Sequence, residues 1–531
     1  MGKMTGLSQE RILDRLPFLG LDIEGVDAES VRIEYNPNRA DFSTDYGIAR
    51  ALKGLVGSEV GLPNYRVADG PITVQADANL AKVRPWIACA VARDLDLDDE
   101  TVRQLISMQE DLHNGIGRKR KKAAIGLHNL DTIKPPLHYK GVPDSFQFVP
   151  LGAAKKMSVR EILRETDTGV AYGPILAGAT AFPMLYDSMD TVLSFPPIIN
   201  GSATKVDTNT KNLFVDVTST EERVGGEALA IICTALADAG GKIESVRVDY
   251  RDSSRITPEL SPTEMTFDGK LARKMTGMDL TPSEMEDCLA KSRIGLNGAG
   301  NALIPRYRVD ILHPVDLAEE VAIGYGLDRI TPLYPASKEP GRLARANSAL
   351  DRVSETVAMA GFIETMNYDL ADAVSLYEKF SRPADSLIEV ENPRTLEHHI
   401  LRDSILPSLM TTLARNVKAA YPQRIFEVGR VFTRGDSGIV ESPHLAAIVA
   451  HSSSSFSEAK MYVEAVVREH LGTGMETRVA QHWAFADGRC AEVIVDGTAI
   501  GHVGELKPSA VASFGLDVPV AGFEVDLSRF L

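Results

Sequence analysis

Apolar positions along the chain recur with two periods, which predict a mixed succession of strands and helices. Residues 86–91 form the continuous apolar run of a buried strand, and residues 424–432 place charged side chains toward one side. Residues 98–112, 227–239 and 346–360 repeat apolar side chains at the spacing of an amphipathic helix. The pattern predicts an α+β chain built from several domains.

Polar, proline-containing stretches predict where these domains are joined. Residues 251–262 and 335–342 have the composition of linkers. A chain of 531 residues has room for about three or four domains at roughly 150 residues each. We therefore expect four regions, which comprise residues 1–83, 84–255, 258–335 and 340–531.

The third region ends in an acidic strand–helix pattern. Residues 307–311 alternate as a half-buried strand does, and the proline that follows suits the first turn of a helix. In this helix Asp316, Glu319 and Glu320 stand at positions i, i+3 and i+4 and share one face. A strand that carries Asp310 to the foot of the helix brings four carboxylates to one patch.

This acidic patch has two interpretations that spacing alone leaves open. Four oxygen ligands suit a hard cation such as Mg²⁺ or Ca²⁺, which would relieve their mutual repulsion. Alternatively, Asp316 caps the helix with Glu319 as its capping-box partner, and the acidic first turn complements the helix dipole. The first interpretation predicts a metal site, and the second predicts an ordinary helix start.

Charge and cysteine content restrict the partners and the compartment. The formal net charge of −16 excludes a surface that coats nucleic acid throughout, so any RNA contact is local or supplied by a partner. The dense basic run at residues 118–122 is either a solvated loop or a contact for RNA phosphates. No apolar run approaches the ~18 residues of a membrane span, and the four scattered cysteines are expected as free thiols in the cytoplasm.

The stretch at residues 306–330 closely resembles the end of the B5 domain in the β subunit of phenylalanyl-tRNA synthetases. The similarity extends over nearly the whole chain and is closest to the shorter archaeal and eukaryotic type. The resemblance implies a winged-helix-like B5 domain for the third region. It also implies Mg²⁺ as a cofactor, with the ligands Asp310, Asp316, Glu319 and Glu320.

Motifs in the first two regions carry the same resemblance. Residues 36–41 and 46–50 are similar to the N-terminal module of the family, and residues 113–128 and 194–201 to its B3/B4 domain. In the family, that domain hydrolyses tRNA mischarged with tyrosine. The resemblance makes residues 84–255 a B3/B4-type editing domain, whose candidate site residues are Ser194, Asn200, Asn212 and Asp216.

The strand pattern at residues 212–218 places Asn212 and Asp216 on a polar face, opposite Leu213 and Val215. Asp216 is then either a solvated charge or a group that accepts the tyrosine hydroxyl or orients a water. The competing interpretation of the four site residues is that they only close turns and solvate a strand.

The last region resembles the antiparallel-sheet module of class II synthetases, as the β chain carries it, in residues 399–408 and 424–432. Arg402 and Arg424 stand where the arginines of a class II active site are expected. The late glycine-punctuated motif is incomplete, because residues 501–508 contain no arginine. The resemblance therefore implies an inactive, catalytic-like module, with ATP bound by another chain.

Two functions from different classes follow. In the first, the chain is the β subunit of a phenylalanine–tRNA ligase that supports assembly, binds tRNA and edits Tyr-tRNA. A separate α subunit would then ligate phenylalanine with ATP, in an α2β2 complex as in the family. In the second, the chain is a free-standing tRNA-binding protein or deacylase. The sequence has no P-loop, His-Glu-x-x-His or Gly-x-Ser-x-Gly motif to support another chemistry.

Overall fold

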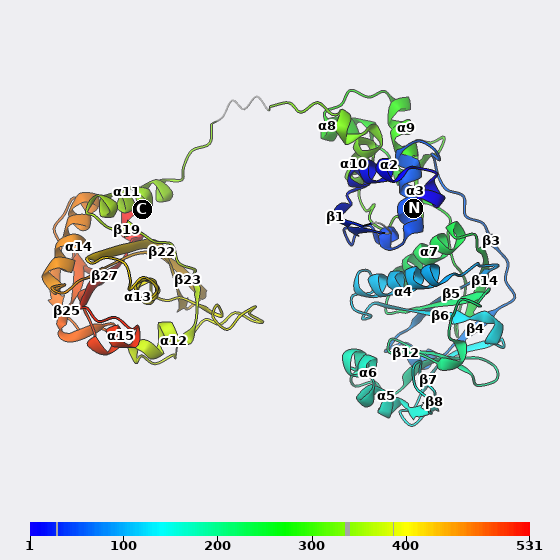
Figure 1. Cartoon of the computed structure of the whole chain (residues 1–531), viewed down its shortest axis with the longest axis horizontal. Coiled ribbons are helices and arrows are strands. Elements are labelled where there is room, and N and C mark those ends of the chain that lie inside the picture. Colours follow the sequence, from blue (N-terminus) through cyan, green and yellow to red (C-terminus); the bar gives the residue numbers. More distant parts are fainter. Residues whose placement is uncertain (28–29, 335–339, 386) are drawn as a thin grey trace. The chain divides into compact units, whose positions relative to one another are not determined.

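The structure is a computed structural model that describes residues 1–27, 30–334, 340–385 and 387–531. The chain divides into two units, residues 1–333 and 334–531 (Figure 1). The linker expected at residues 335–342 lies partly outside the described residues. None of the helices in the described ranges is long and apolar enough to cross a membrane.

The first unit begins with short helices and a hairpin that form a small core of their own. Ser8 and Thr44 cap the helices that follow them by accepting backbone N–H groups. The elements are α1 (Gly2–Thr5), α2 (Gln9–Arg15), β1 (Asp22–Val26), β2 (Val31–Glu34) and α3 (Asp45–Leu55).

The centre of this unit, as far as the structure describes it, is an eleven-stranded sheet with the order β12-β11-β10-β7-β4-β14-β5-β13-β6, and with β3 and β15 beside β14. Its strands are β3 (Val67–Ala68), β4 (Thr73–Ala76), β5 (Trp86–Arg93), β6 (Ala123–Asn129), β7 (Leu137–Val142), β10 (Phe182–Tyr186), β11 (Val192–Phe195), β12 (Ile199–Asn200), β13 (Leu213–Ser219), β14 (Lys242–Asp249) and β15 (Ser254–Thr257). The small strands β8 (Gln147–Phe148) and β9 (Met157–Ser158) pair separately.

Two long helices cover one face of the strands β5, β13 and β6 (Figure 1). They are α4 (Asp99–Asn114) and α7 (Glu222–Asp238), and the short helices α5 (Val159–Glu165) and α6 (Asp167–Tyr172) lie farther along the unit. Leu213, Val215 and Val217 of β13 face the α4 and α7 core. Phe214 faces a second core with residues of β4, β7 and β10, so β13 is buried on both faces.

A three-stranded sheet and three helices complete the unit around a further core. The strands are β16 (Thr263–Thr266), β17 (Gly295–Leu296) and β18 (Asn301–Ile304), and the helices are α8 (Gly269–Thr276), α9 (Pro282–Lys291) and α10 (Pro314–Tyr325). The prediction of a strand at residues 307–311 is wrong. These residues form a turn, which the Arg308 N–H closes on the Pro305 carbonyl at 2.9 Å.

The alternation at residues 307–311 has a cause other than a strand. Tyr307 is buried under the guanidinium of Arg50, 3.6 Å from its ring centroid, and Arg308 is buried between carboxylates. Asp310 therefore reaches the start of α10 on a turn.

The second unit is built on a seven-stranded sheet, within the described residues, of order β19-β22-β23-β27-β26-β25-β24. Its strands are β19 (Ile363–Glu364), β22 (Gln423–Gly435), β23 (Gly438–Ala450), β24 (Glu476–Val479), β25 (Phe485–Val495), β26 (Thr498–Leu506) and β27 (Val520–Asp526), with β20 (Leu370–Ala371) and β21 (Ile400–Leu401) paired apart. Its helices are α11 (Arg345–Met359), α12 (Ala373–Leu376), α13 (Leu406–Arg415), α14 (Phe456–Leu471) and α15 (Pro508–Ser513).

Helices cover both faces of this second sheet. Leu445, Ala447 and Val449 of β23 face the core shared with α11 and α14. Ala446 and Ile448 face the core shared with α13 and α15. A strand buried on both faces is consistent with the nearly continuous apolar run at the end of β23.

Candidate functional site

Asp216 lies in the middle of the eleven-stranded sheet. Its strand β13 pairs with β5 and β6, so that Asp216 stands opposite Cys89 on one side and Gly126 on the other. The side chain is buried, and its Oδ2 lies 2.8 Å from Nε2 of His128. The alternative of a solvated charge at Asp216 is therefore wrong, because both faces of β13 are covered.

His128 links Asp216 to a hydroxyl group, since its Nδ1 lies 2.8 Å from Oγ1 of Thr204. When His128 donates a hydrogen bond through Nε2 to the Asp216 carboxylate, its neutral ring accepts a hydrogen bond from the Thr204 hydroxyl at Nδ1. Gly126 provides the space for this pair. A Cβ at Gly126 would lie 2.1 Å from Asp216 Oδ2 and 2.5 Å from His128 Nε2. The sheet thus holds the carboxylate in one orientation.

A hollow of about 370 Å³ brings three of the four predicted editing residues together. Ser194 on β11, Asn200 on β12 and Asp216 on β13 all line it. The Ser194 Oγ is buried and has no hydrogen-bond partner among the described residues, so it is available to a ligand. The volume lies within the ~300–1,000 Å³ of small-molecule sites.

Asn212, the fourth predicted residue, does not line this hollow. It precedes β13, and its Nδ2 donates to Asp131 Oδ1 at 2.8 Å. Its Oδ1 accepts the N–H of Asp94 at 3.4 Å. The side chain therefore joins loops at the end of the sheet.

One wall of the hollow is charged, and apart from the basic run no sequence pattern predicts it. Arg120 donates to the carbonyl oxygens of Pro197 at 3.3 Å and Ile198 at 3.1 Å, and to Glu110 at 2.7 Å. Glu110 also lies 3.3 Å from Nδ1 of His113. The hydrogen bond from His113 and the charge of Arg120 lower the pKa of Glu110 to about 2, whereas burial lowers the pKa of His113.

The four carboxylates at the start of α10 share their patch with a buried arginine. Arg308 binds Asp310 through Nε at 2.9 Å and Nη2 at 2.7 Å, and also pairs with Glu320. Asp316 accepts the backbone N–H of His313 at 2.7 Å. His313 is the N-cap and Asp316 its capping-box partner. The predicted capping box is therefore present, but it begins at His313 and not at Asp316.

Glu319 makes no ion pair with a described residue. Burial raises its pKa, and the charges of Glu320, Asp316 and Asp310 raise it further. Within the described ranges, no group of three or more His, Cys, Asp or Glu is arranged to hold a metal ion. The patch does not fit Mg²⁺ in this geometry, because Arg308 occupies two of the four carboxylates. Magnesium binding there stays a prediction.

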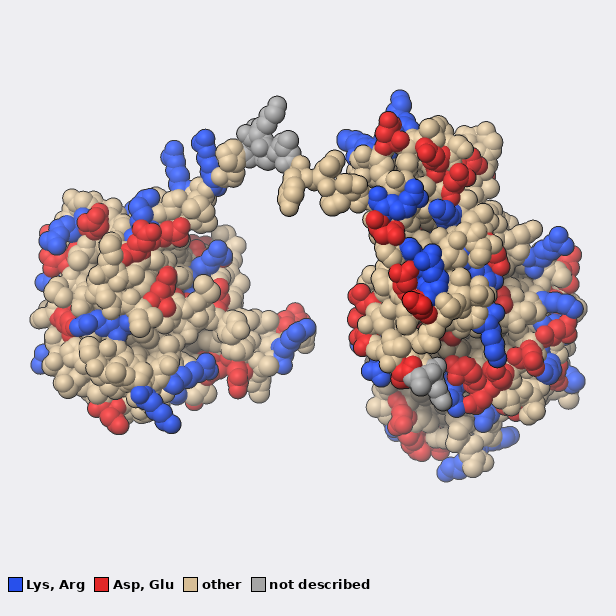
Figure 2. All heavy atoms as spheres, turned by 45° about the horizontal axis from the view of Figure 1, so that its top comes forward, with Lys and Arg blue, Asp and Glu red and all other residues tan. Residues whose placement is uncertain are grey.

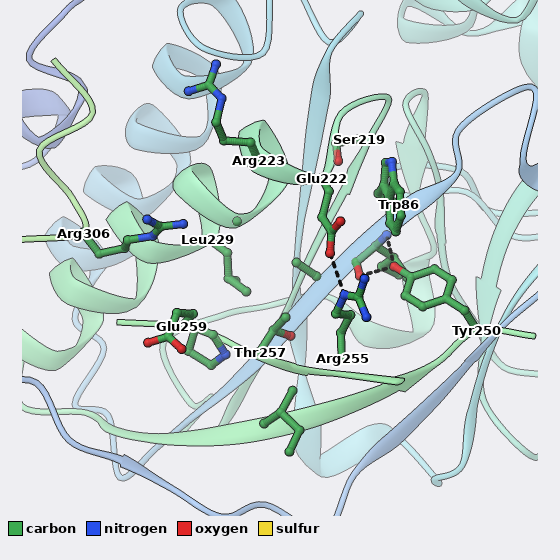
Figure 3. A pocket seen from close by; sticks show the side chains of 15 residues that line it. Trp86, Ser219, Glu222, Arg223, Leu229, Tyr250, Arg255, Thr257, Glu259 and Arg306 are labelled. Carbon is green, nitrogen blue, oxygen red and sulfur yellow. Dashed lines mark hydrogen bonds and ion pairs between the residues drawn. The ribbon is translucent and has the colours of Figure 1, made fainter. Parts of the chain in front are cut away.

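A larger hollow of about 470 Å³ in the first unit contains none of the predicted site residues (Figure 3). Two of its charges neutralise each other, since Arg255 Nε lies 2.8 Å from Glu222 Oε1. The Tyr250 hydroxyl bonds the backbone of Ile87 at 3.0 Å. Much of the polar lining is already engaged, so we place the candidate site in the smaller hollow.

The two arginines expected at a class II-like site are engaged within the second unit. Arg402 is buried, lies 2.7 Å from Glu427 Oε1 and 3.0 Å from Asp369 Oδ1, and donates to the Arg430 carbonyl at 2.9 Å. Arg424 lies 3.5 Å from a carboxylate oxygen of Glu458. Arg402 is therefore engaged by two carboxylates, whereas Arg424 makes one long contact and its buried Nε has no hydrogen-bond partner among the described residues.

Comparisons with known proteins cover nearly the whole chain. A family described as "Phenylalanyl tRNA synthetase beta chain CLM domain" matches residues 330–527, and one described as "tRNA synthetase B5 domain" matches residues 265–327. The chain is 42% identical to the phenylalanine–tRNA ligase beta subunit of Archaeoglobus fulgidus, over 99% of this chain and 96% of that protein. It is 36% identical to the protein of the same name from Methanocaldococcus jannaschii, over 98% and 96%.

A solved structure extends the similarity to the fold. The crystal structure of an N-terminal fragment of the phenylalanyl-tRNA synthetase beta subunit from Pyrococcus horikoshii matches with a TM-score of 0.59 and 36% identity, over 61% of this chain and 97% of the fragment. Together these matches define an aminoacyl-tRNA synthetase subunit.

Within that class, the chain belongs to the family of phenylalanine–tRNA ligase β subunits. The resemblance to the archaeal type is confirmed, as are the B5 domain and the mixed α/β multidomain architecture.

Proposed function

We propose that this β subunit leaves ligation to an α subunit and hydrolyses Tyr-tRNA in the hollow lined by Ser194, Asn200 and Asp216. Family membership supports an α subunit as partner, tRNA as a substrate and a cytoplasmic location. It also supports ATP as a substrate and Mg²⁺ as a cofactor of the whole complex. The observation that carries the editing proposal is the unpartnered, buried Ser194 Oγ, which lines the same hollow as Asp216.

Selective removal of tyrosine requires groups that recognise its hydroxyl. An apolar phenylalanine site rejects such an isostere by only ~10²-fold. A second site that hydrogen-bonds the hydroxyl prefers tyrosine, because phenylalanine would leave buried polar groups unpaired. Here Asp216 accepts a hydrogen bond from the tyrosine hydroxyl, and Ser194 donates one to the hydroxyl oxygen.

The hydrolysis needs one water per ester. The water oxygen bonds to the ester carbonyl carbon, and the bond from that carbon to the ribose oxygen breaks. Free tyrosine and tRNA with its ribose hydroxyl restored are the products. Because the buried sheet fixes Asp216 through His128, the recognising carboxylate keeps its orientation through this step.

The proposed ligation partner follows from the second unit. Binding of ATP phosphates requires free cationic groups. Arg402 is held by Glu427, Asp369 and a backbone carbonyl, which supports a scaffold role for the proposed class II-like module at residues 340–531. Separate cores within residues 1–83 and 258–335 support the proposed division of the first unit into residues 1–83, 84–255 and 258–335.

Three single substitutions in the complex of this chain with its α subunit test the editing proposal. We expect Ser194→Ala to lower kcat/KM for Tyr-tRNA deacylation about tenfold, the effect of one lost hydrogen bond of about 1.5 kcal/mol. Asp216→Asn should lower it further, because the replacement also disturbs the His128 contact.

Asn212→Ala is the matched control, since Asn212 lies in the same domain but outside the hollow. It should leave deacylation at the parent rate, and all three variants should charge phenylalanine normally. If Ser194→Ala and Asn212→Ala clear Tyr-tRNA equally fast, the hollow is not the editing site.

A further inference from the structure

The turn that carries Arg120 has an unusual backbone. Arg118, Lys119 and Arg120 have φ angles of 50°, 53° and 64°, a left-handed conformation that non-glycine residues rarely adopt. Flanking elements impose it. The Arg120 N–H bonds the His113 carbonyl of α4 at 3.1 Å, and the Lys122 N–H bonds the Gly117 carbonyl at 2.9 Å. The turn is therefore held in shape from both ends.

This backbone separates two sets of cations. Arg120 points into the editing hollow, where it binds the Pro197 and Ile198 carbonyls. Arg118, Lys119 and Lys121 are exposed, and no hydrogen bond or ion pair joins their side chains to a described residue. Three free cations are thus held beside the wall of the hollow.

We propose that Arg118, Lys119 and Lys121 bind phosphates of the tRNA whose esterified end enters the hollow lined by Ser194 and Asp216. The inference rests on the proposed editing function, because the three cations would bind the tRNA that delivers its ester to the editing site. Phosphate binding depends on clustered Lys and Arg side chains. A fixed turn presents them without the cost of ordering a loop.

The rest of the surface makes this cluster distinctive. The chain carries a net charge of −16, and Figure 2 shows acidic and basic side chains interspersed over the face in view. Cations paired with carboxylates are poor phosphate ligands. Lys122 of the same run is one of these, since its Nζ lies 2.8 Å from Glu221.

Space for a nucleic acid strand lies next to the turn. Arg118 lines an open hollow of about 850 Å³. Carboxylates that also line it already have partners, because Asp111 accepts from Tyr35 at 2.8 Å and Glu227 from Arg223 at 2.6 Å. Arg118 is the cation of this lining that pairs with no described carboxylate, since Lys122 pairs with Glu221 and Arg223 with Glu227.

The test compares two adjacent pairs of cations in the α–β complex. Arg118→Asn with Lys119→Asn removes two charges, and asparagine tolerates the left-handed φ, so the turn keeps its shape. Lys155→Asn with Lys156→Asn is the control, because these lysines are exposed in the same domain. Binding of uncharged tRNA is measured by anisotropy from 50 to 300 mM KCl, and Tyr-tRNA deacylation at low salt.

We expect the first pair to reduce the slope of log K against log[KCl] by about 1 to 2, at roughly 0.7–0.9 for each phosphate contact. It should also raise KM for Tyr-tRNA severalfold with kcat unchanged. The conservative pair Arg118→Lys with Lys119→Arg should restore both values. An unchanged slope, or an equal reduction of the slope with the control pair, overturns the assignment. An unchanged slope is also the result expected if the turn binds an acidic protein and not tRNA. The binding measurement uses uncharged tRNA, so its result does not depend on whether the chain hydrolyses Tyr-tRNA.

Discussion

At the scale of single residues, buried charges in this chain have close partners, and the motif residues near the N-terminus illustrate this. Arg50 is buried, lies 2.5 Å from Asp238 of α7 and 3.6 Å from the ring of Tyr307. It therefore ties the N-terminal part to the central sheet and to the turn before α10. The motif around residues 46–50 has a structural role in this arrangement.

Glu319 is an exposed carboxylate without an ion pair to a described residue, and it carries a pH-dependent prediction. Its pKa is raised above the ordinary value of 4.5, mainly by partial burial and then by neighbouring carboxylates. The raised pKa means that the Glu319 carboxyl stabilises the folded state when it is protonated, below pH 4.5. This contribution is lost as the pH rises through the folded-state pKa. We therefore expect Glu319→Gln to raise the Tm at pH 7 without metal, and to have a smaller effect at pH 4.

Magnesium gives the same variant a second use. If the acidic patch binds Mg²⁺, the ion raises the Tm of the parent more than that of Glu319→Gln, because it relieves the repulsion that the substitution has already removed. Calorimetry with and without Mg²⁺ measures both effects. Asp14→Asn, at an exposed carboxylate on α2, serves as the control for unspecific ion effects. Equal Mg²⁺ responses in parent and Glu319→Gln would contradict the metal site.

The sequence predicts single residues only as far as local periodicity reaches. The alternation around β13 correctly separates Asp216 from Leu213 and Val215, yet it suggests a polar face. Burial of that face depends on His128, 88 positions away, and on a core contributed by β4, β7 and β10. No local pattern encodes these contacts, and the same holds for Arg120 as a wall of the hollow.

At the scale of elements, the strand β22 depends on an internal ion pair. Arg402 is buried against Glu427 of β22, and a Cβ at Gly429 would lie 2.4 Å from its Nη2. We expect Glu427→Gln to lower the free energy of unfolding by about 3 kcal/mol, because it leaves a buried guanidinium with only a partly exposed carboxylate, Asp369, as partner.

The control pair also involves strand β22. Glu441 on β23 pairs with Arg430 on β22 at 2.7 Å, and both side chains are largely exposed. Glu441→Gln should therefore change stability by less than about 1 kcal/mol. Urea unfolding of both variants measures the difference, and a similar small effect in the two would show that the Arg402 pair contributes little.

Elements with their own start signals follow from the sequence most closely. Asp98 caps α4, where the helix predicted at residues 98–112 begins. The strand expected at residues 307–311 fails for a physical reason: a turn can also alternate buried and polar side chains when each has a different partner. Tyr307 packs under Arg50 and Arg308 binds Asp310, both through tertiary contacts.

At the scale of the whole molecule, we predict that the isolated chain forms no Phe-tRNA, whereas the chain with its α subunit does. Adenylate formation and transfer require cationic groups at the ATP phosphates. In the second unit Arg402 pairs with Glu427 and Asp369, Arg424 lies near Glu458, and residues 501–508 supply no further arginine. Aminoacylation with labelled phenylalanine, with and without the α subunit, measures this directly.

Assembly is the second half of the same prediction. If ligation takes place on the α subunit, the β subunit acts only within a lasting complex, and obligate interfaces bury more than ~2,000 Å². Size-exclusion chromatography with light scattering should therefore give the mass of an α2β2 complex when both chains are present. Phe-tRNA formed by the pure chain would contradict the division of labour. A β chain that elutes alone beside its partner would contradict the assembly and favour a free-standing deacylase.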